Sequence, residues 1–165
     1  MQKINKTKNK SKELVLIVPD IRSALNVGSL FRTADAAGVT KLYLTGYTPR
    51  PTDQFGRVQK DIAKAALGAE TWVPWEYKKT LIPFLKSLKK EGYTLIALEQ
   101  SETSVDYRKI KSGHKTALII GREVEGVDEK ILNLCDIIAE IPMKGKKESL
   151  NVSVATGIML FSLLK

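Results

Sequence analysis

The chain alternates short runs of β-branched and apolar residues with longer stretches in which apolar residues recur three and four positions apart. Five of the short runs have the length of strands, and four of them are almost continuously apolar, which is typical of parallel strands covered on both faces. The predicted strands are Leu14–Val18, Lys41–Leu44, Thr94–Leu98, Thr116–Ile120 and Ile137–Ile141.

The stretches between these strands have the periodicity of amphipathic helices. Their apolar positions are Val27, Leu30, Phe31 and Ala34, then Ile62, Ala65 and Ala66, then Leu81, Phe84, Leu85 and Leu88, and finally Ile131, Leu132 and Cys135. The last stretch, Val152–Leu164, is apolar on most faces, so we expect it deep in the protein or at an interface. This alternation predicts an α/β fold with a mostly parallel sheet flanked by helices.

Length and composition favour one domain preceded by a basic arm. The chain has 165 residues, which suits a single core. Residues 1–12 contain five lysines and one branched apolar side chain, Ile4, so they cannot support a core. This flexible arm is interpreted either as a tail that binds RNA weakly or as a solvated terminus. Residues 13–165 are interpreted as the domain.

Charge favours polyanionic partners. Lysine and arginine outnumber the acidic residues by 27 to 18, a net charge of +9, which suits RNA, DNA or an anionic membrane but equally serves solubility. Cys135 and His114 are the single cysteine and histidine, so we expect no internal disulfide and no metal site. The sequence lacks a membrane-spanning apolar run and a signal peptide, which predicts a cytoplasmic protein.

Three segments that follow predicted strands carry residues able to do chemistry, and ligands of open parallel sheets bind beyond these strand ends. The first, Asn26–Arg32, opens a helix, where free amide groups favour an anion and the Arg32 guanidinium can bind a phosphate. In the plainer interpretation, which the spacing alone favours, Asn26 is a helix cap and Arg32 a surface residue.

The second segment, Gly121–Gly126, directly follows the strand that ends at Ile120. Its two glycines predict a tight strand-to-helix turn over which a ligand could approach the backbone. Glu123 within it is either a hydrogen-bonding anchor or an acid that complements a helix dipole. The chain has neither a phosphate-binding P-loop nor a Gly-x-Gly-x-x-Gly sequence, so a Rossmann-type fingerprint is absent.

In the third segment, residues 141–155, a loop with Pro142, Gly145 and three lysines leads into the last helix through Ser149 and Asn151. A capped helix after a basic turn accounts for Ser149 and the lysines. It does not account for two glycine-bearing loops and an Asn-to-Arg helix gathered at strand ends.

A further stretch, Thr45–Gly56, has two prolines, two glycines and no periodicity, which predicts a long irregular loop. Arg50 within it, and Arg57, Lys60 and Lys64 after it, are either phosphate contacts or parts of a solvated connector.

In their order and separations, the three segments resemble the SpoU (TrmH-like) family of the SPOUT superfamily of RNA methyltransferases. The resemblance extends from Leu14 to Leu164. It implies transfer of a methyl group from S-adenosylmethionine to a ribose 2′-hydroxyl of tRNA or rRNA, with tRNA favoured. It also implies a SPOUT domain over residues 13–165 with a deep C-terminal trefoil knot, and a homodimer whose active site lies between the subunits.

Matched position by position, the family's motifs assign roles to residues of this chain. Arg32 matches the residue credited with activating the hydroxyl. The residues that this match implies for catalysis are Arg32, Asn26, Ser149, Asn151 and Glu123. Those implied for cofactor binding are Leu98, Gly121, Ile141, Ser149 and Leu150. Those expected to bind RNA are Arg32, Arg50, Arg57, Lys144, Lys146 and Lys147.

Other interpretations fit part of the sequence. A SPOUT enzyme that methylates a base is the nearest, although the first and third segments favour ribose. A non-catalytic RNA-binding module with the same fold would keep the charge without transferring a methyl group, and a test of cofactor binding separates it from an enzyme. A nucleotide-binding α/β domain is disfavoured by the missing phosphate loops.

Overall fold

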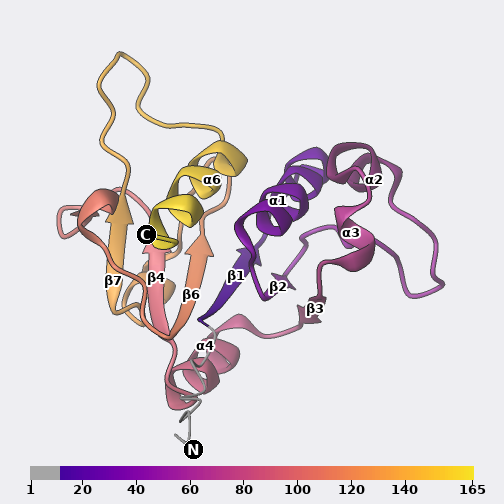
Figure 1. The fold of residues 1–165 in the computed structure, drawn as a ribbon, viewed down its shortest axis with the longest axis horizontal. Coiled ribbons are helices and arrows are strands. Elements are labelled where there is room, and N and C mark those ends of the chain that lie inside the picture. Colours follow the sequence, from indigo (N-terminus) through magenta and orange to yellow (C-terminus); the bar gives the residue numbers. More distant parts are fainter. Residues whose placement is uncertain (1–11) are drawn as a thin grey trace, which may run out of the picture.

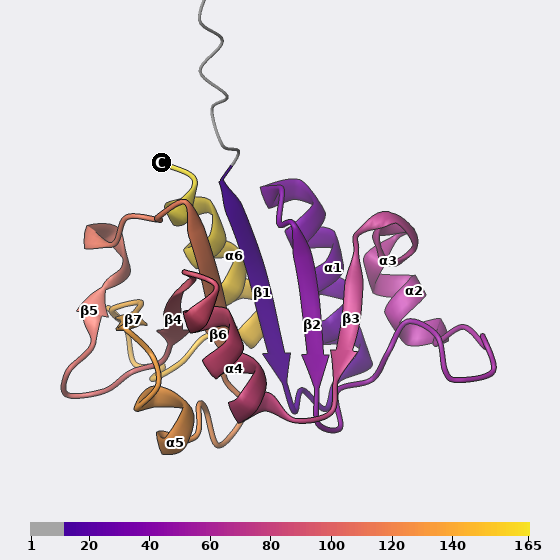
Figure 2. The same ribbon diagram turned by 90° about the horizontal axis from the view of Figure 1, so that it is seen from below.

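Seven parallel strands form one sheet in the computed structural model, which describes residues 12–165 (Figure 1, Figure 2). The order across the sheet is β3-β2-β1-β6-β4-β7-β5. The strands are β1 Glu13–Pro19, β2 Lys41–Thr45, β3 Trp75–Lys78, β4 Thr94–Leu98, β5 Val105–Asp106, β6 Lys115–Ile120 and β7 Ile137–Glu140. The predicted basic arm, residues 1–12, lies outside the described residues except for Lys12.

All five predicted strands are confirmed, with ends that differ by one residue or less. Sequence patterning missed the two strands at the edges of the sheet, β3 and β5. The four residues of β3 are all half-buried, and β5 has two residues, so neither forms the continuous apolar run that marks a strand buried on both faces.

Helices cover both faces of the sheet, as predicted. They are α1 Ala24–Ala37, α2 Lys60–Ala66, α3 Ala69–Trp72, α4 Leu81–Lys90, α5 Glu129–Leu132, α6 Val152–Leu163 and the 3₁₀ helix η1 Tyr107–Lys109. Of these, α3 and η1 were not predicted, because one turn is too short to show a period. No helix of residues 12–165 combines the length and the apolar character needed to cross a membrane.

Two apolar layers lie on opposite faces of the sheet. One layer joins α1, α2, α3 and α6 to side chains such as Leu16 of β1, and the other joins α4 and α5 to side chains such as Ile17 (Figure 2). Successive side chains of a strand point to opposite faces, so a strand buried on both must be apolar at every position. This explains the continuous apolar run of β1, in which six of seven residues are buried.

Gly28 lets α1 approach α2 closely. A Cβ atom built on Gly28 would lie 2.4 Å from the Ile62 carbonyl oxygen and 2.7 Å from the Ala65 Cβ. Both distances are shorter than nonbonded carbon contacts allow, so any side chain would push the helices apart.

We therefore expect Gly28→Ala to lower the free energy of unfolding by about 1–3 kcal/mol, the usual cost of overpacking a core. Urea denaturation followed by circular dichroism measures the change. Gly145→Ala is the matched control, because among the described residues no heavy atom beyond its chain neighbours lies within 4 Å of the added methyl group. Equal stability of the two variants would contradict the close packing of α1 on α2.

Candidate active site at the strand ends

A cavity of about 700 Å³ opens at the carboxyl ends of β4, β6 and β7. Its walls are the segments that follow these strands, 98–100, 120–126 and 140–151, and the first turn of α6. The five residues predicted to bind a cofactor all contribute to this lining: Leu98, Gly121, Ile141, Ser149 and Leu150. The parallel topology brings them together, because the carboxyl ends of parallel strands meet at one edge of the sheet.

The segment 121–126 is a closed loop rather than the predicted strand-to-helix turn. Arg122 and Gly126 exchange backbone hydrogen bonds of 3.0 and 3.2 Å, and α5 begins only at Glu129. Gly121 has no room for a side chain, since a Cβ there would lie 2.7 Å from the Gly126 carbonyl carbon. Gly126 has φ 69°, a conformation that glycine adopts without strain.

Glu99, which follows β4, holds this loop in place through hydrogen bonds. One of its carboxylate oxygens accepts a hydrogen bond of 2.7 Å from the Val127 N–H, and the other accepts one of 2.8 Å from the Gln100 N–H. Across the cavity, the Gln100 amide donates to the Glu148 carbonyl at 2.7 Å, which joins the segments after β4 and β7. Sequence reasoning missed Glu99 and Gln100, although their place directly after a predicted strand was an available signal.

Glu123 binds the first turn of α1. Its carboxylate accepts hydrogen bonds from the backbone N–H groups of Arg22 and Ser23, each at 3.2 Å, and from the Asn26 side-chain amide at 3.4 Å. Of the two predicted roles, the anchor is therefore confirmed. The carboxylate also complements the positive end of a helix dipole, but that of α1 rather than of a helix following its own loop.

Asn26 links this anchor to the third segment. Its side-chain oxygen accepts a hydrogen bond of 3.2 Å from the Asn151 amide, whose own oxygen accepts one of 2.9 Å from the Ser153 N–H and so caps α6. The prediction that Asn26 itself caps α1 is wrong, because Ser23 is the N-cap and its hydroxyl accepts from the Asn26 N–H. The three sequence segments thus meet in one hydrogen-bonded chain, Glu123–Asn26–Asn151.

These hydrogen bonds set the charge of Glu123. Desolvation by itself would raise the pKa of this carboxyl. The hydrogen bonds from its own backbone N–H, from Ser23 and Arg22, and from Asn26 outweigh desolvation and hold the pKa below its ordinary value of 4.5. Glu123 is therefore ionised at neutral pH and acts as a hydrogen-bond acceptor, not as an acid.

Ser149 and Arg32 have different surroundings. Ser149 is exposed in the cavity wall, and its hydroxyl makes no hydrogen bond within residues 12–165. Arg32 is an exposed residue of α1 that does not line the cavity, and it forms no ion pair with the residues that the structure describes. A single copy of the chain therefore brings Asn26, Glu123, Ser149 and Asn151 together but leaves Arg32 apart.

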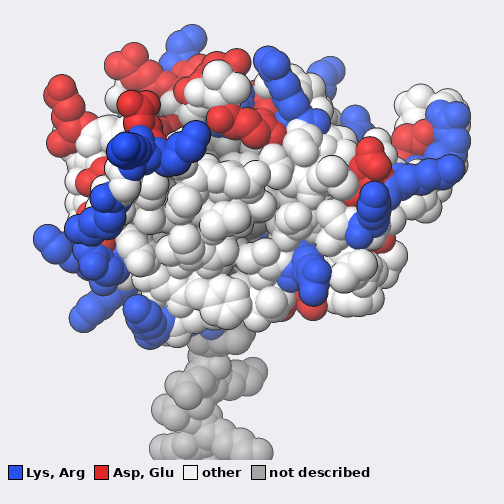
Figure 3. Space-filling model, turned by 90° about the horizontal axis from the view of Figure 1, so that it is seen from above, with Lys and Arg blue, Asp and Glu red and all other residues white. Residues whose placement is uncertain are grey.

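The predicted RNA-binding residues lie in two other places. Lys144, Lys146 and Lys147 are exposed in the loop between β7 and α6, where Lys147 also lines the cavity. Arg50 and Arg57 belong to the loop between β2 and α2, next to the opposite edge of the sheet. In Figure 3, basic side chains stand at both ends of the molecule, and the surface between them, over α1 and α6, is largely uncharged.

The single cysteine and histidine lie outside this site. Burial raises the pKa of the Cys135 thiol to about 12, so the thiol stays protonated at neutral pH and is a poor nucleophile. His114 is exposed before β6, at the amino ends of the strands. Within residues 12–165 no group of three or more His, Cys, Asp or Glu is placed to hold a metal ion.

Parallel strands whose end loops line a cavity of small-molecule size define the class: an α/β domain that binds a ligand at the carboxyl ends of its strands. The chain belongs to the SpoU rRNA Methylase family, whose model matches residues 13–161. It is 33% identical over 152 residues to the tRNA (guanosine(18)-2′-O)-methyltransferase of Aquifex aeolicus, covering 92% of this chain and 69% of that protein. The enzyme of the same description in Escherichia coli is 31% identical, over 90% of this chain and 62% of that one.

Solved structures agree. The AdoMet-bound rRNA methyltransferase of Sinorhizobium meliloti superposes with a TM-score of 0.83 at 30% identity, over 93% of this chain and 56% of that chain. The Aquifex aeolicus TrmH/SpoU tRNA-modifying enzyme superposes with a TM-score of 0.80 at 30% identity, over 93% and 74%. The matched part of this chain spans between 58% and 69% of the length of three relatives that are similar in sequence.

The lowered pKa of Glu123 makes a pH prediction. The ionised Glu123 carboxylate stabilises the folded protein. This stabilisation is fully present above pH 4.5, the ordinary pKa of a glutamate, and is lost as the pH falls through the lower pKa that Glu123 has in the folded protein. Glu123→Gln should therefore melt below the wild type at pH 7, and the difference should shrink as the pH falls below 4.5.

Thermal denaturation across this pH range measures the difference. Glu125→Gln is the control, because the Glu125 carboxylate forms only surface ion pairs with Arg22 and Arg122, at 3.6 and 3.9 Å. A constant gap between wild type and Glu123→Gln at all pH values would disprove the role of the ionised carboxylate.

Proposed function

We propose that this chain is an S-adenosylmethionine-dependent methyltransferase that acts on a ribose 2′-hydroxyl of RNA. The observation that carries the proposal is the hydrogen-bonded chain Glu123–Asn26–Asn151, which joins the first segment to the second and third segments where those two line the cavity. Relatives described as tRNA and rRNA 2′-O-methyltransferases support it.

The cavity fits the cofactor in size and chemistry. Its volume of about 700 Å³ lies within the range of small-molecule sites. Leu98, Ile141 and Leu150 supply apolar surface for an adenine ring, and Glu140 and Gln100 supply hydrogen-bonding groups for hydroxyl or ammonium groups. When bound, S-adenosylmethionine supplies a methyl group activated by a sulfonium charge.

The residues of this chain must orient the ribose and help to remove a proton. Asn26 has both ends of its amide engaged by Glu123 and Asn151, so we assign it to positioning. Arg32 stays protonated in a protein, and we assign it to binding the neighbouring phosphate and stabilising the ionising 2′-oxygen. The proton passes to a phosphate oxygen of the RNA, either directly or through the Ser149 hydroxyl, which donates its own proton as it accepts this one.

A homodimer explains why Arg32 lies away from the cavity of its own chain. Arg32 follows Leu25 by seven residues on α1, so both lie on the same face of the helix, and Leu25 is 49% exposed. Val154 and Phe161 of α6 are likewise exposed apolar side chains. Such a surface fits a second copy of the chain, whose cavity Arg32 would complete.

Three further expectations belong to this proposal. A C-terminal trefoil knot is supported by contacts of α6 with the connection between β5 and β6, including the hydrogen bond of 2.7 Å from the Ser112 hydroxyl to the Leu163 carbonyl. Residues 13–165 form the methyltransferase domain, in keeping with the matched residues 13–161.

An RNA-modifying role is expected in the cytoplasm. We expect tRNA to be the favoured substrate and rRNA the second.

Arg32→Ala should lower kcat by about a hundredfold at saturating RNA, the usual loss when a group that stabilises developing charge is removed. Transfer of tritium from labelled S-adenosylmethionine into unfractionated tRNA, and separately rRNA, measures it. Label in alkali-resistant dinucleotides identifies ribose methylation.

Calorimetric titration with S-adenosylmethionine is the control, since Arg32→Ala should bind the cofactor as the wild type does. Full turnover in Arg32→Ala would reject the role of Arg32. Cofactor binding without transfer to either RNA would point to another substrate. Lack of cofactor binding would favour a non-catalytic RNA-binding module, and label in a base would favour the base-methylating branch.

Mixed dimers test the shared site. Leu150→Trp should block the cavity, and Arg32→Ala should remove the phosphate contact, so each homodimer should be inactive. In a heterodimer of the two variants, the open cavity of one subunit meets the intact Arg32 of its partner, and about half of the wild-type activity should return if one of two sites is restored.

Co-expression with two affinity tags yields the heterodimer, and the tritium assay measures its activity. If Arg32 served the cavity of its own chain, both sites of the heterodimer would be broken and no activity would return. Analytical ultracentrifugation of Phe161→Glu, which should be monomeric, tests the interface itself.

A further inference from the structure

Three pairs of an arginine and an aromatic ring lie between the Glu123 anchor and the tip of the β2–α2 loop, and two of the rings, Tyr47 and Phe55, are exposed. Next to the Glu123 anchor, the guanidinium of Arg22 lies 5.9 Å from the centre of the Tyr47 ring. In the loop after β2, the Arg50 guanidinium lies 3.9 Å from the centre of the Tyr77 ring. At the tip, the Arg57 guanidinium lies 5.1 Å from the centre of the Phe55 ring.

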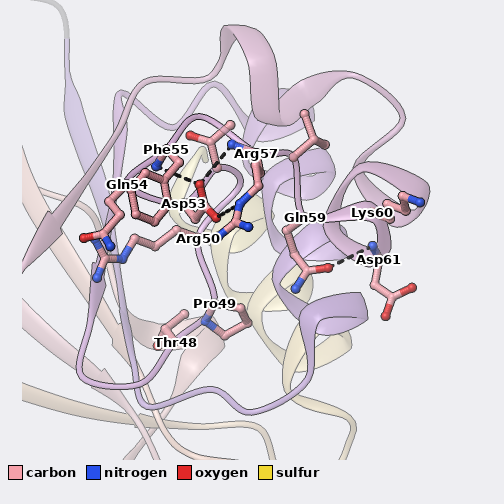
Figure 4. A pocket seen from close by; sticks show the side chains of 12 residues that line it. Thr48, Pro49, Arg50, Asp53, Gln54, Phe55, Arg57, Gln59, Lys60 and Asp61 are labelled. Atoms are coloured by element: carbon pink, nitrogen blue, oxygen red, sulfur yellow. Dashed lines mark hydrogen bonds and ion pairs between the residues drawn. The ribbon is translucent and has the colours of Figure 1, made fainter.

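The tip of the loop is an ordered hairpin centred on Asp53 (Figure 4). Thr52 and Val58 form an antiparallel bridge, and the Asp53 carboxylate accepts hydrogen bonds of 2.8 and 3.0 Å from the Phe55 and Arg57 N–H groups. It also accepts one of 2.6 Å from the Arg57 Nε. The backbone hydrogen bonds from Arg57 are the main reason that the pKa of Asp53 lies below its ordinary value.

The base of the loop is fastened to the sheet. The buried Thr48 hydroxyl donates to the Val18 carbonyl at 2.9 Å and accepts from the Ile21 N–H at 3.1 Å. The Tyr47 N–H donates to the Asp20 carboxylate at 3.0 Å. Because β2 is parallel to its neighbours, this base lies at the carboxyl ends of the strands, as the cavity does.

This rigid hairpin displays a large apolar ring that the core does not use. Phe55 is 72% exposed, and in Figure 4 its ring lies near the arginines of the loop beside a hollow lined by residues 48–61. Aromatic rings paired with cations bind unpaired nucleic-acid bases by stacking, while the cations meet phosphates. A guanidinium plane such as that of Arg50 is a second stacking surface of this kind.

We propose that the hairpin 52–58 is a second RNA-binding site, in which an unpaired nucleobase stacks on Phe55 and adjacent phosphates contact Arg57 and Arg50. The inference rests on the proposed function in that the chain must bind RNA. A net charge of +9 and the position of the loop at the carboxyl edge favour RNA over a protein partner. One RNA strand can then reach both this site and the cavity.

Phe55→Ala should weaken binding of unfractionated tRNA about tenfold, within the range measured when a stacking ring is removed. Phe55→Leu, which keeps apolar surface but lacks a ring, should weaken it equally, whereas Phe55→Tyr should bind as the wild type does. Val58→Ala is the matched control, since Val58 is 60% exposed in the same hairpin but has no ring.

A single-stranded RNA of about ten nucleotides carrying 2-aminopurine reports stacking directly. Its emission should be quenched by the wild type and by Phe55→Tyr, but not by Phe55→Ala. In the tritium assay, Phe55→Ala should raise KM for RNA and leave kcat unchanged, because it removes binding that the ground state and transition state share.

Wild-type RNA affinity in Phe55→Ala would overturn the inference. Wild-type affinity in Phe55→Leu would also overturn it, because the contact would then be apolar rather than stacked. A changed sedimentation coefficient of Phe55→Ala with unchanged RNA binding would assign the ring to a contact between copies of the chain. Failure of methyl transfer is distinguishable, since binding and quenching are measured without it.

Discussion

The carboxylate of Glu123 holds the site together. The first N–H groups of a helix have no partner within the helix. At the start of α1, the backbone N–H groups of Arg22 and Ser23 donate to the Glu123 carboxylate, which belongs to a loop about 100 residues later in the chain. Asn26 passes the connection on to Asn151 at the start of α6. These hydrogen bonds fix the loop 121–126 to the starts of α1 and α6 beside the cavity, in addition to the packing of the two helices in one core.

Much of the fold was predictable because the central strands are buried on both faces and so carry continuous apolar runs. The edge strand β3, Trp-Glu-Tyr-Lys, was missed because it is half-buried throughout. Local patterning also cannot show contacts between distant segments, such as those of Glu99 with Val127 and of Asn26 with Glu123. It likewise assigned the cap of α1 to Asn26 instead of Ser23, three residues earlier.

The candidate site was predicted in part, and the reason lies in the kind of residue. The residues matched to the cofactor line one cavity, because a parallel sheet brings its strand ends together regardless of side chains. The parallel topology does not place Arg32, which is exposed on α1 and lies outside the cavity of a single copy of the chain. In the proposed homodimer, the face of α1 that carries Arg32 and the exposed Leu25 would contact the second subunit.

Because the Glu123 carboxylate accepts hydrogen bonds from the Arg22 and Ser23 N–H groups just before α1, the positive end of this helix already carries a negative charge, which disfavours a substrate phosphate there. In the proposed function, recognition of the RNA backbone then falls to long arginine and lysine side chains, which can change rotamer. Backbone amides impose one geometry on an anion, whereas such side chains adapt to several. In the proposed function, the protein therefore holds the RNA backbone with adaptable side chains rather than with a fixed set of backbone amides.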